Sequence, residues 1–93
     1  MPTRLSESEI RQRMQDLPDD WTTDGQTLFY TITFTDFVAA IAFVNRLVDP
    51  AEKLGHHPDI TITYNRVSLQ LTTHDASGLT DLDFQLAQEI SQL

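Results

Sequence analysis

Cysteine is absent from this chain of 93 residues, and basic residues are few. Without cysteine, a disulfide framework, a thiol nucleophile and a zinc site built on thiolates are all excluded. Six lysines and arginines stand against 14 aspartates and glutamates, which gives a formal net charge of −8. Because no basic cluster could neutralise phosphates, we expect the protein to bind neither nucleic acid nor an anionic membrane surface.

Long apolar runs are also missing. No stretch is long enough to span a bilayer, and the opening residues MPTRLSESEI lack the apolar centre of a secretory signal, so a cytoplasmic protein is expected. The length indicates a single domain over residues 1–93, which buries only about 60–65% of the surface of its unfolded chain. Association with further copies would supplement so small a core.

Capping patterns mark the first and last helices. Ser6 with Glu9 three residues later forms a capping box, and Pro18 should end the helix that follows. Thr80 with Asp83 repeats the capping-box spacing before the last apolar stripe. We therefore expect a helix near each end of the chain.

A middle helix is predicted to begin near residues 35–36. Apolar residues follow at helical spacing: Phe37, Ala40, Ile41, Val44, Leu47 and Val48. Pro50 should kink or break the helix because it lacks an N–H donor and clashes with the preceding turn. Gly55 is a plausible end for a short continuation.

Two hairpins separate these helices. With Asp24-Gly25 as a two-residue loop, Trp21 faces Leu28, and alternation places a set of large residues on the core face: Trp21, Leu28, Tyr30, Ile32 and Phe34. Phe29 then points outward. The resulting order αββαββα predicts a two-layer α+β domain in which all strands can be antiparallel and helices cover one face.

The second hairpin directs attention to the histidines. If Asn65-Arg66 is its loop, Ile62 faces Leu69, and extending this register beyond the strands brings His57 opposite His74. Glu52 and His56 lie four residues apart, so they share a face if the helix continues. Three imidazoles that titrate near neutral pH can supply both an acid and a base.

Other interpretations of these residues stay open. A single histidine on a polar sheet face is usually only solvated, and one at a helix end can stabilise the last carbonyl groups. Trp21 is explained equally well as a core residue, and Asp83 as a helix cap. A metal site formed by Glu52 and the three histidines is a weaker alternative, because the familiar metal-binding signatures are absent.

The pattern Glu52-x3-His56-His57-Pro58, followed by Tyr64, His74 and Asp83, resembles the signature of the pterin-4a-carbinolamine dehydratases, also known as dimerisation cofactors of a hepatocyte nuclear factor. The phrases AEKLGHHP, YNRVSLQLTTHD and GLTDLDFQLAQEI are similar to that family as well. The likeness extends from about Leu5 to the C-terminus. It implies a four-stranded antiparallel sheet with helices packed on one face.

The resemblance also implies an activity, the dehydration of 4a-hydroxytetrahydrobiopterin without metal or cofactor. His56 and His74 would be the acids, His57 would bind the pterin and assist as base, and Glu52 would orient the imidazoles. By the same likeness Asp59, Asp83 and Trp21 would bind substrate together with His57. Expected partners are the small-molecule pterin, a second copy or three further copies of the chain, and a functional link to an aromatic amino acid hydroxylase.

Some positions depart from the family pattern. Ile60 replaces an aromatic residue found in many relatives, and Asp81-Leu82 replaces a commonly basic pair. These changes bear on substrate affinity more than on the chemistry.

The alternative hypothesis is a non-enzymatic assembly or dimerisation module on the same fold, acting as a transcriptional cofactor or a rubisco assembly factor.

Overall fold

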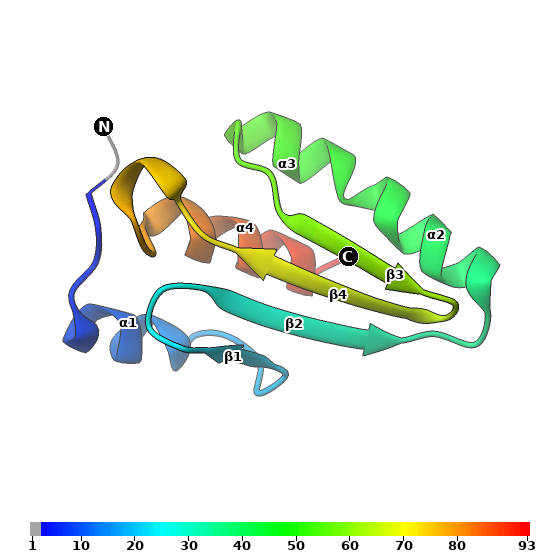
Figure 1. Ribbon diagram of the computed structural model, residues 1–93, viewed down its shortest axis with the longest axis horizontal. Helices are drawn as coiled ribbons and strands as arrows, with labels where there is room; N and C mark the ends of the chain where they lie inside the picture. The colour runs from blue at the N-terminus through cyan, green and yellow to red at the C-terminus, as the bar shows by residue number, and fades with distance from the viewer. Residues whose placement is uncertain (1–2) are drawn as a thin grey trace.

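The computed structural model describes residues 3–93, and over these residues four helices and a short 3-10 turn (η1) accompany a four-stranded sheet (Figure 1). The elements are α1 (Glu7–Met14), β1 (Trp21–Thr23), β2 (Leu28–Thr33), α2 (Phe37–Arg46), α3 (Val48–Leu54), β3 (Asp59–Thr63), β4 (Arg66–Leu71), η1 (His74–Ala76) and α4 (Asp81–Ser91). This order confirms the predicted αββαββα arrangement, with the middle helix in two parts.

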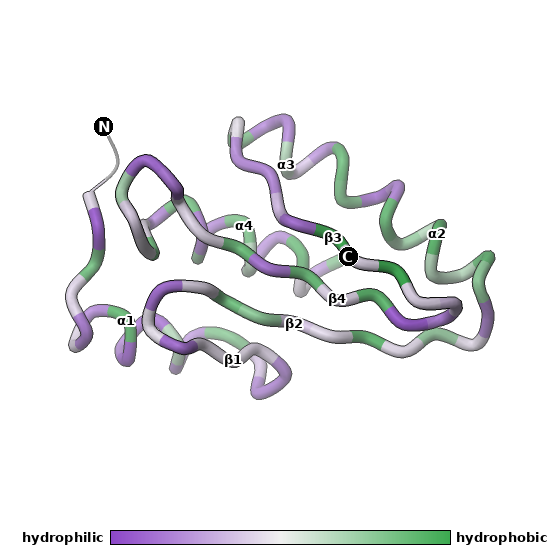
Figure 2. The backbone as a smooth tube through the Cα atoms, viewed as in Figure 1, coloured by the Kyte–Doolittle hydropathy of each residue, from purple (hydrophilic) through white to green (hydrophobic). Residues whose placement is uncertain are grey.

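The sheet is antiparallel throughout, with strand order β1-β2-β4-β3. Hydrophobic and hydrophilic residues alternate along β4 (Figure 2), and its Val67, Leu69 and Leu71 are buried against the helices. The opposite face is polar and uncovered, as shown by exposed Thr31 and Gln70. The prediction of a two-layer α+β domain with helices on one face is confirmed.

The predicted register of the first hairpin is wrong by two residues. Trp21 pairs with Tyr30 instead of Leu28, so the loop contains four residues, 24–27. Side-chain hydrogen bonds explain the wider loop, because Asp24 Oδ1 accepts from the N–H groups of two later loop residues and Thr23 Oγ1 donates to the carbonyl of Thr27. A shift of two preserves the side-chain alternation, so the predicted core face is still correct.

The second hairpin is displaced by the same amount. Ile62 pairs with Val67 rather than Leu69, and the loop is 64–65. Asn65 holds this turn against the end of β2, since its side-chain amide and its carbonyl group bind the backbone carbonyl and N–H of Phe34. The chain reaches this turn only by placing Tyr64 at φ +53°, a left-handed conformation that is uncommon for a large residue.

Most helix boundaries follow the predicted signals, but α1 already ends at Met14, so the prediction that Pro18 ends this helix is wrong. Ser6 and Glu9 form the capping box of α1, and Asp36 caps α2 through a 2.8 Å hydrogen bond from the N–H of Ala39. The middle helix breaks just before Pro50, which occupies the first turn of α3, where its missing N–H has no helical partner to lose. Gly55 ends α3 at φ +61°.

The core lies between the sheet and the helices. Its fully buried large side chains include Phe84, Leu28, Leu47, Leu69, Leu71, Leu79, Leu86 and Ile90. Phe43 also belongs to it, although the predicted stripe of α2 omitted this residue. Conversely, several large apolar residues that the patterns placed toward the core are exposed: Phe37, Val48, Ile60, Tyr64 and Leu93. Phe37 and Val48 are the first residues of α2 and α3.

Candidate functional site

The three histidines line one hollow at the end of the β3–β4 hairpin. Its volume is about 300 Å³, and its lining comprises Gly55, His56, His57, Thr72, Thr73, His74 and Asp75. Two chain segments form it, the corner between α3 and β3 and the segment that links β4 to η1. The structure therefore brings together residues that are seventeen positions apart in the sequence, as the pattern of histidines had suggested.

The end of α3 sets the direction of the first two histidines. Gly55 turns the chain into the left-handed conformation, and the N–H of His56 then bonds to the carbonyl of Ala51 at 3.0 Å. Pro58 follows, which favours an extended chain before it, and β3 begins one residue later. The two imidazoles consequently leave the corner in different directions and meet different carboxylates.

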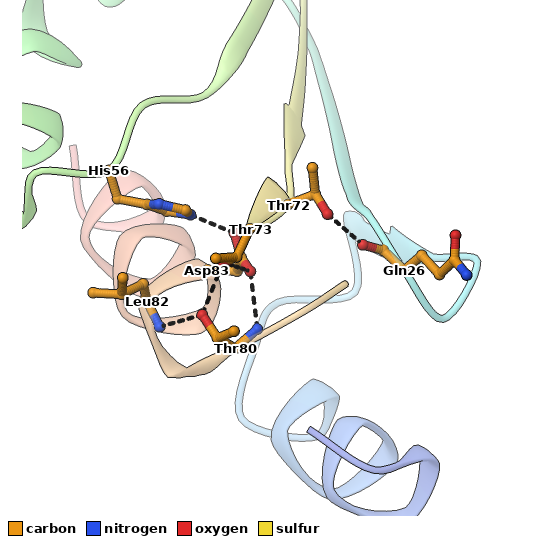
Figure 3. A network of polar contacts seen from close by, with 7 residues as sticks. All are labelled: Gln26, His56, Thr72, Thr73, Thr80, Leu82 and Asp83. Atoms are coloured by element: carbon orange, nitrogen blue, oxygen red, sulfur yellow. Dashed lines mark hydrogen bonds and ion pairs between the residues drawn. The ribbon is translucent and has the colours of Figure 1, made fainter. Parts of the chain in front are cut away.

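His56 is bound to Asp83. Its Nε2 lies 2.5 Å from Oδ1 of this residue, which belongs to the first turn of α4, and the side chain of His56 is only 11% exposed (Figure 3). Asp83 itself is fully buried, and its other oxygen accepts from Thr73 and from the backbone of Thr80. Asp83 has no exposed surface and completes the capping box of α4, which favours the helix-cap alternative, and its predicted contact with substrate stays a prediction.

His57 is bound to Glu52. Nε2 of the ring lies 2.6 Å from Oε2 of the carboxylate, and both side chains are largely exposed. The prediction had assigned Glu52 to His56, on the assumption of a continuous helix. That assignment is wrong because the left-handed Gly55 ends the helix one residue before His56, so spacing by four no longer places the two side chains on one face.

His74 opens η1 on the other side of the hollow, and it is exposed. The predicted pairing of His57 with His74 does not form, because the register of the hairpin is shifted by two residues and because β3 begins after His57 while β4 ends before His74. Among the side-chain hydrogen bonds of residues 3–93, none involves the His74 ring. Its two nitrogens thus face solvent or a ligand.

Two further predicted site residues lie outside the lining of this hollow. Trp21 is 3% exposed, stacks on Tyr30 with ring centres 4.4 Å apart and donates from its indole N–H to Ser91. It begins β1, at the opposite edge of the sheet from β3, which favours the core alternative, and its predicted contact with substrate stays a prediction. Asp59 starts β3 with an exposed side chain, directly after the histidine corner.

An apolar groove adjoins the histidines. It has a volume of about 210 Å³ and is lined by Val44, Asn45, Leu47, Val48, Ala51, Glu52, His57, Pro58 and Ile60. Glu52 and His57 both line this groove, and His57 also lines the histidine hollow. Ile60, the residue that departs from the family pattern, forms part of its wall. Sequence reasoning missed this groove, because its lining comes from two helices and a strand edge that only the fold brings together.

Thr73 was also missed. It lies two residues beyond the end of β4 and directly before His74, and a threonine near a strand end carries no signal of its own. In the structure it is buried and its hydroxyl donates to Asp83 at 2.8 Å. Beside it, the hydroxyl of Thr72 donates to the carbonyl of Gln26 and attaches the β1–β2 loop to the edge of the hollow (Figure 3).

This arrangement can be compared with known proteins. Residues 3–93 match the family model described as pterin 4 alpha carbinolamine dehydratase. The chain belongs to the pterin-4-alpha-carbinolamine dehydratase family. A Cyanothece sp. (strain PCC 7425) protein named "putative pterin-4-alpha-carbinolamine dehydratase" is 57% identical over all of this chain and 95% of its own length. A relative of the same name from Chloroflexus aurantiacus is 50% identical, covering 97% of this chain and 96% of its own.

Solved structures agree with this family assignment. A crystal structure described as a transcriptional coactivator/pterin dehydratase from Brucella melitensis superposes with a TM-score of 0.89 at 37% identity, covering 97% of both chains. A pterin dehydratase-like protein identified as a rubisco assembly factor of the alpha-carboxysome gives a TM-score of 0.63 at 20% identity, covering 77% of this chain and 83% of that one. The second likeness shows the fold alone.

The donor atoms near the hollow are arranged in pairs. Within residues 3–93, no group of three or more histidine, aspartate or glutamate side chains is arranged to hold a metal ion. His56 and His57 each contact a different carboxylate instead.

Within residues 3–93, no helix combines the length and apolarity needed to cross a membrane.

Proposed function

We propose that the protein catalyses the dehydration of a 4a-hydroxytetrahydropterin, such as 4a-hydroxytetrahydrobiopterin, to the quinonoid dihydropterin. One observation supports this proposal above the others, the convergence of His56, His57 and His74 on one hollow in a member of this family. Two of the rings are paired with carboxylates, which can hold each imidazole in one orientation.

The reaction needs only proton transfers. The C4a–O bond breaks, and the hydroxyl group leaves as water after it receives a proton from an acid. A base removes the proton on N5, and the electron pair of that N–H bond forms the C4a=N5 double bond. Imidazoles suit both steps because their pKa lies near neutral pH, where the acid and base forms coexist.

The roles of individual residues are part of the proposal. His56 and His74 serve as acids on the two sides of the hollow, and His57 contacts the pterin and assists as the base. Glu52 orients His57, the ring that it contacts in the structure. The apolar groove beside His57 provides a surface on which a flat pterin ring or its side chain can rest, with Ile60 at its edge.

A dehydratase assay tests the proposal directly. The substrate is generated in the cuvette by an aromatic amino acid hydroxylase, and the quinonoid product is followed by its absorbance. We expect the protein to accelerate product formation well above the spontaneous rate. No acceleration at micromolar protein would reject the proposed function.

The link to such a hydroxylase in the same cell and a cytoplasmic location both stay predictions.

A second candidate is a non-enzymatic assembly module on the same fold. Exposed apolar side chains in the first turn of α2 favour it, since Phe37 is 49% exposed and Val38 is 75% exposed. Neighbouring genes separate the two candidates: a hydroxylase gene supports the dehydratase, whereas carboxysome or rubisco genes support assembly. A chain that is inactive in the assay but binds a partner through α2 would favour this second candidate.

A further inference from the structure

A continuous set of hydrogen bonds joins the start of α4 to the histidine hollow (Figure 3). Oδ1 of Asp83 contacts Nε2 of His56, while Oδ2 accepts from the Thr73 hydroxyl at 2.8 Å and from the Thr80 backbone N–H at 3.0 Å. The hydroxyl groups of Thr73 and Thr80 are themselves 2.8 Å apart. Three segments that are distant in sequence, the end of α3, the end of β4 and the start of α4, therefore meet at one carboxylate.

The directions of these bonds follow from counting protons. Thr73 has one hydroxyl proton and donates it to Asp83, so in the contact between the two threonines Thr80 must be the donor. The hydroxyl oxygen of Thr80 in turn accepts from the N–H of Leu82. Oδ2 of Asp83 already receives two donors and carries no proton. If Asp83 is ionised, Oδ1 can only accept, and Nε2 of His56 is then the donor in this contact.

From this network we infer that Asp83 and Thr73 are positioning residues for His56, and that neither of them contacts the pterin. Asp83 keeps a proton on Nε2 of His56 whether the ring is neutral or charged. Nδ1 is consequently the nitrogen that accepts or releases the catalytic proton. Thr73 prevents the carboxylate from rotating, because it holds Oδ2 beside the cap of α4. This inference rests on the proposed function, since it assigns the active nitrogen of one histidine in that reaction.

Helix capping alone does not account for this arrangement. Capping requires only that one oxygen of Asp83 accept the N–H of Thr80. The second oxygen is fully buried and is directed at an imidazole 27 residues away in sequence. A buried carboxylate is expensive to desolvate unless all its hydrogen-bonding capacity is used, and Thr73 supplies part of that compensation.

Asp83→Asn tests which atom donates the hydrogen bond between residue 83 and His56. The Thr73 hydroxyl and the Thr80 N–H require an acceptor, so the amide oxygen of the asparagine should occupy the place of Oδ2. Its NH2 group then faces Nε2 of His56 and can only donate. We expect the neutral ring to switch to the tautomer protonated on Nδ1, the wrong nitrogen, with little change of shape. Replacing the carboxylate that fixes a catalytic tautomer is costly in well-studied hydrolases, and we expect kcat to fall by about 10²–10⁴-fold here.

The measurement is long-range nitrogen-15 NMR of the His56 ring, together with kcat and KM for dehydration. In the wild type, the neutral ring should carry its proton on Nε2, and finding it on Nδ1 would overturn the inference whatever the variants do. Asp83→Asn should reverse the tautomer and lower kcat. A folded Asp83→Asn variant with wild-type kcat would also overturn it.

Thr73 variants keep the test decisive if Asp83→Asn fails to fold. Thr73→Val removes the hydroxyl at nearly constant shape, and we expect kcat to fall about 10-fold with KM little changed, as is typical of outer groups that orient a histidine. Thr73→Ser should restore the rate. Thr31→Val is the matched control, because its hydroxyl bonds Ser68 on the open face of the sheet, away from the hollow; its mass by light scattering is compared with that of the wild type, so that an effect on association is recognised.

The outcomes separate this inference from the proposed function. A wild-type protein without dehydratase activity would reject the proposed function, whereas the NMR tautomer would still report whether Asp83 positions His56. An active wild type whose Thr73→Val variant equals Thr31→Val in kcat would reject the role of Thr73. An active wild type in which both Thr73→Val and Asp83→Asn lose kcat, with Thr73→Ser recovering it, would support the inference.

Discussion

The carboxylate of Glu52 lies 2.6 Å from Nε2 of His57, and both side chains stand largely in solvent at the end of α3. An exposed pair of this kind contributes only about 0–1 kcal/mol to folding. The pair matters for geometry, because the contact with Glu52 fixes the orientation of the His57 ring, which lines both the histidine hollow and the apolar groove. The pair therefore bears on activity more than on stability.

Glu52→Ala should accordingly lower the dehydration rate by about 10-fold while leaving the melting temperature nearly unchanged. Glu52→Gln is the matched variant, since it keeps the side-chain length and an acceptor oxygen but loses the charge. An intermediate rate for the glutamine variant would indicate that orientation and charge both contribute. Equal rates for wild type and Glu52→Ala would contradict the role assigned to this residue.

His57→Ala and His74→Ala should each reduce activity by about 10²–10⁴-fold, the usual contribution of one acid or base. Both side chains are exposed and neither supports the core, so circular dichroism should show an intact fold. Rates and spectra measured on the same preparations test this prediction. Full activity in both variants, or loss of the fold in both, would show that the site has been assigned incorrectly.

Chelation should leave the activity unchanged. The mechanism proposed here uses proton transfer between imidazoles, carboxylates and substrate, with no step that requires a Lewis acid. The measurement is the dehydration rate after exhaustive dialysis against a chelator, with and without added zinc. Loss of activity that zinc restores would replace the acid–base mechanism by a metal-dependent one.

The protein should form a homodimer or homotetramer. A chain of 93 residues has a small core, and the polar face of its sheet as well as the outer side of α2 lacks cover. Light scattering at micromolar concentration and moderate salt should give two or four times the chain mass of 10.6 kDa. Phe29→Asp would disrupt association through the open sheet face, and Val38→Asp would disrupt association through α2. A wild-type mass equal to that of one chain would contradict the prediction.

The cap of α1 should make stability depend on pH. Hydrogen bonds from the backbone and hydroxyl groups of Ser6 hold the pKa of the Glu9 carboxyl below its usual value. Because the folded-state pKa is the lower one, this stabilisation is present above the unfolded-state pKa of about 4.3 and is lost as the pH falls through the folded-state value. Glu9→Ala should therefore lower the melting temperature near neutral pH and have a smaller effect in strong acid. An effect of equal size at both pH values would argue against this linkage.

Local signals in the sequence were sufficient for the helix starts and for the end of α3, but not for the end of α1, which lies at Met14 rather than at Pro18. Ser6 with Glu9, and Thr80 with Asp83, lie three residues apart, so each capping box forms from neighbouring residues wherever the rest of the chain goes. Gly55 likewise ended α3 through its own backbone freedom. The face of each strand was also predictable, because side chains alternate with period two and both register errors were shifts of two.

The exact register and the partners of the histidines depended on the tertiary structure. Asn65 fixes the second turn by binding Phe34, 31 residues earlier, and no local pattern contains that contact. The sequence by itself determined that the three histidines gather at one end of a hairpin, because hairpin topology dictates that. Which carboxylate each ring meets depended on the left-handed turn at Gly55 and on the packing of α4 beneath the sheet, since hydrogen bonds between distant segments form only when the fold brings their atoms within 3 Å.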